Sequence, residues 1–306
     1  VLFRSLRQQA GATELELSRA DALTVDIEPT DLLILTDADP VRVDAILKRH
    51  TARVRSSIAL VNVKVRSVDP LFELSETAGL QILTRRAGSE VQQPTPTQKV
   101  FEDIHRKFAW GAGESVSGPG SSLAATERIR EELPKLFADF GVTSLLDLPC
   151  GDHHWMNTML KQCPELNYLG ADIVPGLIAG NRKRFPQRRF DLLDLIRSPL
   201  PKADVVLVRD CFVHLPAADV QEAITNIVNS GSRWLIATTF PGRTHHDIPA
   251  GHWRPMDLTA APFSLPPPLK LINEGCTEGG GAFADKSLGV WDVLTLTTPR
   301  PSAQAG

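Results

Sequence analysis

Acidic residues end two apolar runs in the second half of the chain. Asp147 closes a run that begins at Val142, and Asp172 ends the run YLGADI, 25 residues later. This separation corresponds to about one β-α-β step, so both side chains are expected at the same edge of a parallel sheet. An acidic group at the end of the second strand accepts hydrogen bonds from ribose hydroxyls. The pair therefore predicts a site for a ligand that contains a nucleoside.

The turn after the first run indicates which nucleoside ligand this is. It reads LPCGDHH, with the single glycine Gly151 between Asp147 and Asp152. A dinucleotide site needs the pattern G-x-G-x-x-G here, because the pyrophosphate must approach the backbone closely. Two carboxylates would repel a pyrophosphate, but they suit a cation such as a sulfonium with an amino-acid tail. The turn therefore favours S-adenosylmethionine over NAD.

A histidine and an aspartate follow a later apolar run, in the segment RDCFVH. Methyl transfer is an in-line displacement at carbon, so the enzyme mainly positions the two reactants. A hydroxyl acceptor is a poor nucleophile until its proton leaves, and histidine has a suitable pKa for removing it. We expect His214 to be the general base, the alternative being a histidine that packs at the start of the next helix. Asp210 is expected either to be the base or to orient it.

A glycine-rich and serine-rich stretch, WGAGESVSGPGSS, precedes these elements. Its composition excludes regular structure, and its length predicts an ordered functional loop or lid. Glu114 and Ser115 would then close over the methionine tail of the donor, the alternative being a solvated loop. Trp110 would stack on the adenine or on a sugar ring, the alternative being simple burial.

A second loop, GHWRP, combines a hydrogen-bond donor, an aromatic ring and a cation in His252, Trp253 and Arg254. This combination suits a polar acceptor such as a glycan. Arg254 has an alternative role as the ion-pair partner of Glu274 or Glu278.

The elements that position these residues follow from the spacing of apolar residues. The pattern predicts strands over residues 142–148, 168–173, 190–195, 203–209, 233–239 and 288–296. It predicts helices over residues 100–108, 126–140, 155–161, 175–184 and 217–229, and the second of these should bury Ile129, Leu133, Leu136 and Phe137. Regular alternation of strand and helix indicates an α/β fold with a doubly wound Rossmann-like sheet over residues 100–306.

The first part of the chain has its own pattern. It predicts strands at 31–36, 57–63 and 80–84, a helix at 41–53 and a short helix at 71–77. This β-α-β-α-β order implies a parallel sheet. Because it amounts to about half a domain, we interpret residues 1–87 as a truncated Rossmann-like segment. The polar residues 88–99 carry two prolines and are predicted to be a linker.

Composition excludes several classes of function. The net charge of -3 argues against a nucleic-acid backbone as the partner. No apolar run approaches the roughly 20 residues of a membrane span, and no signal peptide is recognisable. The four cysteines lack CxxC spacing, and the adjacent histidine pairs lack carboxylates at ligand spacing, so no metal is expected. A cytoplasmic location is predicted.

Residues 101–291 resemble bacterial class I S-adenosylmethionine-dependent methyltransferases. LLDLPCGD resembles their glycine-rich first motif, YLGADIVPGLI the ribose-binding second motif, and FDLLDL the stretch that meets the adenine amino group. RDCFVHL resembles the fourth motif, beside the methyl donor. The resemblance implies that the cofactor is bound by Asp147, Cys150, Gly151, Asp172, Ile173 and Asp194. Pro149 departs from the family, which usually has glycine there.

Two further stretches, AWGAGESVSGPGSS and CTEGGGAFADKSLGVW, resemble a narrower subfamily found with polysaccharide gene clusters. This resemblance implies methylation of a sugar or glycan hydroxyl, and association with glycosyltransferase domains. The alternatives are methylation of a small metabolite at oxygen or nitrogen, and a non-catalytic cofactor-binding scaffold in glycan assembly. Residues 25–86 weakly resemble the carboxyl-terminal half of another methyltransferase-like Rossmann domain.

Overall fold

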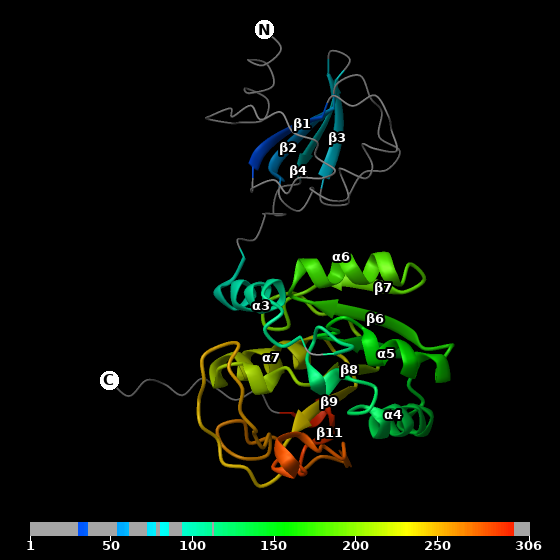
Figure 1. Ribbon diagram of the computed structural model, residues 1–306. Helices are drawn as coiled ribbons and strands as arrows, with labels where there is room; N and C mark the ends of the chain where they lie inside the picture. The colour runs from blue at the N-terminus through cyan, green and yellow to red at the C-terminus, as the bar shows by residue number, and fades with distance from the viewer. Residues whose placement is uncertain are drawn as a thin grey trace. The chain divides into compact units, whose positions relative to one another are not determined.

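A computed structural model describes residues 94–111 and 113–296, together with the backbone of four strands between residues 30 and 85. The chain divides into two compact units, residues 1–93 and 94–306. Both units are drawn in Figure 1.

The described part of the first unit is a mixed sheet. Its strands are β1 (Thr30–Leu35), β2 (Val54–Leu60), β3 (Phe72–Thr77) and β4 (Leu80–Arg85), in the order β1-β2-β4-β3. Only β1 and β2 are parallel, because β4 runs antiparallel to both β2 and β3. The predicted all-parallel sheet is therefore wrong. The helix predicted at 41–53 lies outside the described residues.

The short helix predicted at 71–77 is also wrong, because this segment is β3. In FELSET the apolar Phe72 and Leu74 alternate with polar residues, which is the two-residue period of a strand. Thr77 pairs with Leu80, so only two residues connect β3 to β4. Such a tight connection is typical of a β-hairpin, which pairs the two strands in register.

The second unit is built on a seven-stranded sheet. Its strands are β5 (Ser144–Asp147), β6 (Asn167–Asp172), β7 (Arg189–Leu192), β8 (Val205–Val208), β9 (Trp234–Thr239), β10 (Lys270–Asn273) and β11 (Ser287–Asp292). The spatial order is β10-β11-β9-β8-β5-β6-β7, and β11 runs antiparallel to both of its neighbours. Strand β5 lies between β6 and β8, so the chain winds outward first on one side of β5 and then on the other. The predicted doubly wound Rossmann-like sheet is confirmed.

The central strands are buried on both faces. In β8, Val206 and Val208 contact one apolar cluster, whereas Val205 and Leu207 contact a second cluster on the opposite face. Helix α7 (Ala217–Asn229) covers the first face, and α4 (Glu127–Phe140) with α5 (His154–Met159) covers the second. Figure 1 shows these helices on opposite sides of the sheet. The uninterrupted apolar runs of the sequence result from this double burial.

Most predicted elements agree with the structure. Helices α6 (Pro175–Arg184) and α7 have the predicted bounds, and the four residues predicted to be buried in α4 are buried. Strand β10 is missed by the sequence pattern, β7 ends at Leu192 before Asp194, and a 3-10 turn replaces the end of the last predicted strand. Helix α3 (Pro96–Arg106) begins earlier than predicted, because the hydroxyl of Thr95 caps it by accepting a hydrogen bond from the backbone N–H of Gln98.

The two sheets share one pattern of strands. The order β1-β2-β4-β3 repeats the order β8-β9-β11-β10 of the second unit. In both, the first two strands are parallel, and the last strand in the chain runs antiparallel to its two neighbours. The first unit therefore has the strand arrangement that a carboxyl-terminal half of the same fold would have.

Candidate active site

A cavity of about 510 Å³ opens at the carboxyl ends of β5, β6 and β8, where the strand order reverses. This is the position at which doubly wound folds bind their ligands, and the volume is in the range of small-molecule sites. The structure brings together there nine of the residues singled out from the sequence: Trp110, Asp147, Cys150, Gly151, Asp172, Ile173, Asp210, His214 and Trp253.

Two buried carboxylates occupy one end of this cavity. Asp172 accepts hydrogen bonds from the backbone N–H groups of Gly151, at 3.1 Å, and Val174, at 3.0 Å. Asp147 accepts a hydrogen bond of 2.8 Å from the hydroxyl of Tyr168. Burial raises the pKa of Asp147 to about 7 and that of Asp172 to about 6, although these hydrogen bonds act in the opposite direction. A cationic ligand at this end would favour the ionised form of both groups.

The turn after β5 is fastened to the glycine-rich loop. Gly151 has φ of +53°, and a Cβ there would lie 2.3 Å from the hydroxyl of Ser117. The carboxylate of Asp152 accepts hydrogen bonds of 3.0 Å from the Ser115 hydroxyl and from the backbone N–H of Val116. Asp152 therefore holds the loop over the turn. The sequence predicts that the carboxylates of Asp147 and Asp152 flank a cation. In the structure the carboxylate of Asp152 binds the loop instead.

Glu114 and Ser115 do not line the cavity. Ser115 is buried against Asp152, and Glu114 accepts a hydrogen bond from the backbone N–H of Leu123. Glu114 also lies 3.4 Å from Nε2 of His154. These two side chains shape the loop from behind, which differs from the direct contact with the methionine tail that the sequence predicts.

His214 lies on a 3-10 turn after β8, with Trp110 stacked on its ring at a centroid distance of 4.4 Å. Its Nδ1 is 2.8 Å from the backbone carbonyl of His252. A carbonyl only accepts, so Nδ1 carries the proton and Nε2 keeps its lone pair. Burial lowers the pKa of His214 from its ordinary value, so the ring is neutral at pH 7. A neutral imidazole with a free Nε2 is the form that a general base requires.

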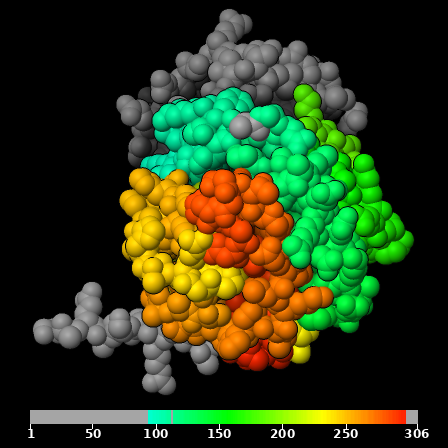
Figure 2. Space-filling model, turned by 60° about the horizontal axis from the view of Figure 1, so that its bottom comes forward, coloured from blue at the N-terminus to red at the C-terminus, as the bar shows by residue number. Residues whose placement is uncertain are grey.

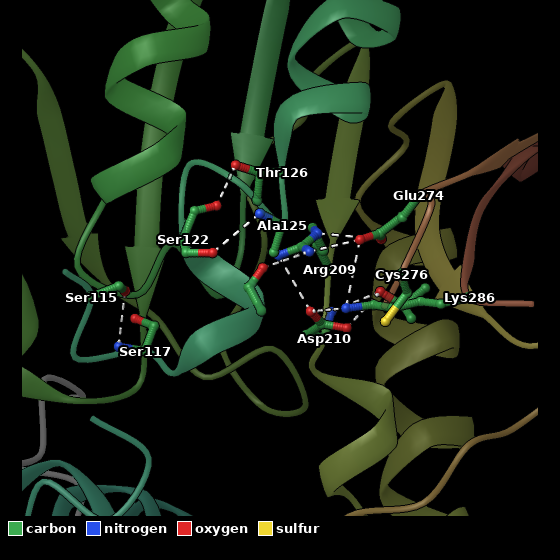
Figure 3. A network of polar contacts seen from close by, with 12 residues as sticks. Ser115, Ser117, Ser122, Ala125, Thr126, Arg209, Asp210, Glu274, Cys276 and Lys286 are labelled. Atoms are coloured by element: carbon green, nitrogen blue, oxygen red, sulfur yellow. Dashed lines mark hydrogen bonds and ion pairs between the residues drawn. The ribbon is translucent and has the colours of Figure 1, made fainter. Parts of the chain in front are cut away.

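Four charged side chains form a closed network beside His214 (Figure 3). Arg209 donates to Glu274, with 2.7 Å between Nη2 and Oε2, and to the backbone carbonyl of Gly120, at 2.9 Å. Lys286 lies 2.6 Å from Oδ2 of Asp210 and 3.5 Å from Glu274. The two cations and two carboxylates thus balance one another in a region where an unpaired charge would be costly.

This network makes Asp210 a weaker proton acceptor than an unpaired carboxylate would be. Burial alone would raise the pKa of Asp210, but the charges of Lys286 and Arg209 outweigh it and hold that pKa well below its usual range. A carboxylate so firmly ionised is a weak base at neutral pH. Asp210 also has φ of +51°, held by a hydrogen bond of 2.8 Å from its N–H to the hydroxyl of Thr238. Whether Asp210 is the base or orients it stays a prediction, and its ion pairs with Lys286 and Arg209 favour the orienting role.

Besides Glu114 and Ser115, three more of the predicted residues lie outside the cavity lining. Asp194 caps a turn, accepting from the backbone N–H of Ile196 at 2.8 Å, because β7 ends two residues earlier. His252 contributes its backbone carbonyl to His214. Arg254 is fully buried and donates to the carbonyl of Leu215 at 2.7 Å, so it anchors its loop.

The alternative ion pair of Arg254 is also wrong. Glu274 pairs with Arg209 and Lys286 instead, and no described salt bridge joins Arg254 to Glu278. The sequence named Glu274 only as an alternative partner of Arg254, and it did not single out Arg209. Strand β10 was not recognised, and only its antiparallel pairing with β11 places Glu274 next to Lys286. The signal available for Arg209 was its position directly before Asp210, at the end of an apolar run.

The opposite end of the cavity is aromatic. Trp253 packs edge-on against Phe283, at a centroid distance of 4.7 Å, and against Phe240, at 6.0 Å, and 42% of Trp253 is exposed. In Figure 2 the yellow surface of the segment around residue 245 adjoins the orange-to-red surface around residue 280. An exposed indole face beside polar groups suits a ring that carries both C–H and hydroxyl groups.

The charged groups that line the cavity are mostly acidic. They are the carboxylates Asp147, Asp152, Asp172, Asp210 and Glu278 and the cations Arg209 and Lys286. Since the two cations are paired within the network, the cavity favours a cationic ligand and disfavours a pyrophosphate.

Within the described ranges, no three histidine, cysteine, aspartate or glutamate side chains are grouped so as to hold a metal ion. His153, one of the adjacent histidines, is buried and bonded to Tyr168. The helices of the same described ranges include none that is both long and apolar enough to span a bilayer.

Comparison with known proteins gives similarity at the level of solved structures. No family model matches the chain, and no curated protein does. Magnesium protoporphyrin IX methyltransferase (ChlM) from Synechocystis PCC 6803 with bound SAH is similar with 14% identity and a TM-score of 0.38, over 48% of this chain and 73% of that one. The sugar N-methyltransferase KedS8 from Streptoalloteichus sp ATCC 53650 has 18% identity and a TM-score of 0.35, over 45% and 60%.

Human N-acetylserotonin methyltransferase (ASMT) in complex with SAM is similar over 72% of this chain and 79% of its own. The identity is 11% and the TM-score 0.40. These three proteins act on different acceptors, and each acceptor is a property of that protein.

Proposed function

We propose that this protein transfers a methyl group from S-adenosylmethionine to a hydroxyl of a sugar or glycan. The observation that carries the proposal is the pair of buried carboxylates, Asp147 and Asp172, at the switch point of the sheet. They end adjacent parallel strands and line one cavity with Gly151, whose N–H holds Asp172 in place. The donor supplies the methyl group as a sulfonium, and its positive charge fits this acidic end.

Each end of the cavity has its own part in the reaction. Asp172 accepts hydrogen bonds from the ribose hydroxyls, and Asp147 offsets the positive charge of the donor. The acceptor lies toward Trp253 and Phe283, with its reactive hydroxyl at Nε2 of His214, which removes the proton as the methyl group is transferred. Two features support a sugar as the acceptor. The indole of Trp253 is partly exposed, and the two cations that line the cavity, Arg209 and Lys286, are ion-paired with carboxylates, so neither is free to bind a phosphate.

Isothermal titration calorimetry with S-adenosylmethionine, and separately with NAD, tests the donor. We expect heat with the former only, and binding of NAD in its place would overturn the proposal. Formation of S-adenosylhomocysteine is then measured with neutral oligosaccharides, nucleotide sugars, phenols and amines. Turnover with neutral sugars supports the proposed acceptor, turnover with phenols or amines assigns a small-metabolite enzyme, and donor binding without any turnover indicates a scaffold.

A further inference from the structure

Behind the donor end of the cavity lies a buried chain of three side chains. Nδ1 of His153 is 3.0 Å from the hydroxyl of Tyr168, and that hydroxyl is 2.8 Å from Oδ2 of Asp147. All three residues are less than 5% exposed, and Asp147 alone of the three lines the cavity. Tyr168 is the only tyrosine in the protein.

The hydrogen bonds of this chain run in one direction. Tyr168 has a single proton, and it donates that proton to Asp147. The tyrosine oxygen must then accept from His153, so Nδ1 of His153 carries its proton. Nε2 of His153 is buried without a partner, and burial together with Arg188 and Arg184 lowers the pKa of His153 to about 3. The ring is therefore neutral, and the hydroxyl of Tyr168 is oriented to donate to the carboxylate of Asp147.

The surrounding sequence makes room for this arrangement. Gly170 follows Tyr168 on the same face of β6, and a Cβ on Gly170 would lie 2.6 Å from the tyrosine hydroxyl. The His153 ring packs edge-on against Phe185 and Phe190 at centroid distances of 4.9 and 5.0 Å. His153 itself has φ of +60°, a conformation that is uncommon outside glycine and, among other residues, is found most often for asparagine, aspartate and histidine.

We propose that Tyr168 and His153 are positioning residues that hold Asp147 oriented and ionised for the positively charged methyl donor. This inference rests on the proposed function. The other titratable or charged groups around Asp147 are Asp172 on β6, Arg209 after β8 and Cys150 in the turn. Asp172 disfavours the ionised carboxylate of Asp147 and Arg209 favours it, while the donated proton of Tyr168 opposes the effect of burial.

Replacing Tyr168 with Phe removes the donated proton and leaves the ring in place. A hydrogen bond to a charged group is worth about 1.5–3 kcal/mol, so the midpoint of the Asp147 titration should rise by about one pH unit or more. The dissociation constant of S-adenosylmethionine is measured by calorimetry from pH 6 to pH 8.5 for the wild type and Y168F. We expect Y168F to bind about fivefold or more weakly at pH 7, and the difference from the wild type to shrink steadily toward pH 8.5.

The ratio of the two dissociation constants is the informative quantity, because titration of Asp172 and of the donor's own amino group is common to both proteins. A ratio that stays constant with pH would overturn the proposal, since a purely structural role weakens binding equally at every pH. Failure of the wild type to bind the donor at any pH would overturn the proposed function instead. The two failures are therefore distinguishable.

Two more variants separate the hydrogen bonds from the packing. In His153→Asn the amide N–H can take the place of Nδ1–H, and asparagine tolerates the backbone conformation, so the pH profile should resemble that of the wild type. Phe190→Leu disturbs the aromatic packing without touching the hydrogen bonds, and its midpoint should also be unchanged. A shift in F190L as large as that in Y168F would contradict the proposal.

The single tyrosine permits a direct spectroscopic check. In protein labelled with carbon-13 at tyrosine Cζ, one resonance reports the phenol of Tyr168. We expect it to move with pH at the titration midpoint of Asp147, and to become independent of pH once S-adenosylmethionine is bound. A chemical shift that changes neither with pH nor on addition of the donor would overturn the proposal.

Discussion

At the scale of single residues, the cavity assigns different tasks to side chains of the same type. Asp147 and Asp172 are buried with few compensating charges, so burial raises their pKa values to about 7 and about 6. The side chain of Asp210 is 27% exposed, and Lys286 lies 2.6 Å away and keeps it ionised. His214 is held neutral, with Nε2 as its available acceptor. Environment, more than residue type, decides which of these groups binds a cation and which accepts a proton.

Replacing His214 with Asn should separate proton removal from binding. The asparagine N–H can still donate to the carbonyl of His252, but no base remains. We expect kcat to fall by about 10²–10⁴-fold while the dissociation constant of the donor stays within about twofold. Steady-state kinetics and calorimetry measure the two quantities. Unchanged turnover would remove His214 as the base.

The wild-type pH profile provides a second test of His214. Because its pKa is lowered from the ordinary value, the base form predominates above about pH 6.5. Turnover at saturating donor should therefore rise with pH on the acidic side of neutrality, and the rising limb should be missing in H214N. A limb that persists in H214N must come from another group.

Replacing Asp172 with Asn should affect binding of the donor rather than the chemistry. Its carboxylate loses one acceptor for the backbone N–H groups of Gly151 and Val174, and with it an acceptor for ribose hydroxyls. We expect donor binding to weaken by about 10–100-fold, with kcat at saturating donor within about threefold of the wild type. D191N, at an exposed carboxylate paired with Arg182, is the matched control and should bind normally.

At the scale of elements, the glycine-rich loop is shaped by the turn that it covers. The carboxylate of Asp152 binds the Ser115 hydroxyl and the N–H of Val116, and the backbone of Asp152 donates to the hydroxyl of Ser117. Figure 3 shows the Ser115 and Ser117 part of this loop beside the charged network. Since Gly120 also accepts from Arg209, the loop is tied both to the turn after β5 and to the end of β8.

Replacing Asp152 with Asn should loosen this loop. The two oxygens of Asp152 accept one hydrogen bond each, from Ser115 and from Val116. Asparagine keeps only one oxygen, and its amide nitrogen cannot accept, so one of these two hydrogen bonds is lost. We expect faster proteolysis within residues 113–118 and donor binding weakened by about 5–50-fold, with a melting temperature lowered by only a few degrees. Limited proteolysis with mass spectrometry, calorimetry and thermal unfolding measure these effects. An unchanged cleavage rate would show that other contacts hold the loop.

At the scale of the whole molecule, the burial of Asp147 lowers the free energy of unfolding at pH values where its carboxylate is ionised. The pKa of Asp147 is about 7 in the folded protein, above its value of 3.8 when exposed. Its stabilising contribution is therefore complete below about pH 4 and is lost as the pH rises through 7. A bound cation reverses this loss, because it favours the ionised carboxylate.

Replacing Asp147 with Asn should therefore stabilise the ligand-free protein at high pH. The asparagine stays neutral, whereas the wild-type carboxylate ionises as the pH rises. The free energy of unfolding of D147N relative to the wild type should increase by about 2–3 kcal/mol between pH 5 and pH 8. Denaturant titration at both values measures it, and D147N should also lose affinity for the donor. A difference that does not change with pH would show that Asp147 does not titrate in this range.

The sequence by itself determined the second unit's sheet and most of what ends its strands. Apolar runs buried on both faces, followed by glycine or an acidic residue, placed Asp147, Gly151 and Asp172 correctly, because strand periodicity and turn chemistry are local properties. It failed where pairing is not local. Strand β3 is fixed by its hairpin with β4, and Glu274 meets Lys286 only through the pairing of β10 with β11.

Only the tertiary structure decided the ionisation and the partners of the site residues. No local pattern distinguishes Asp210, neutralised by a lysine 76 residues later, from Asp147, which meets a tyrosine hydroxyl in the next strand. The same holds for Arg254, whose burial made it a loop anchor, and for His153, which became part of a hydrogen-bonded chain. Charge and proton affinity depend on distance and burial in three dimensions, whereas strand position depends on neighbours in the sequence.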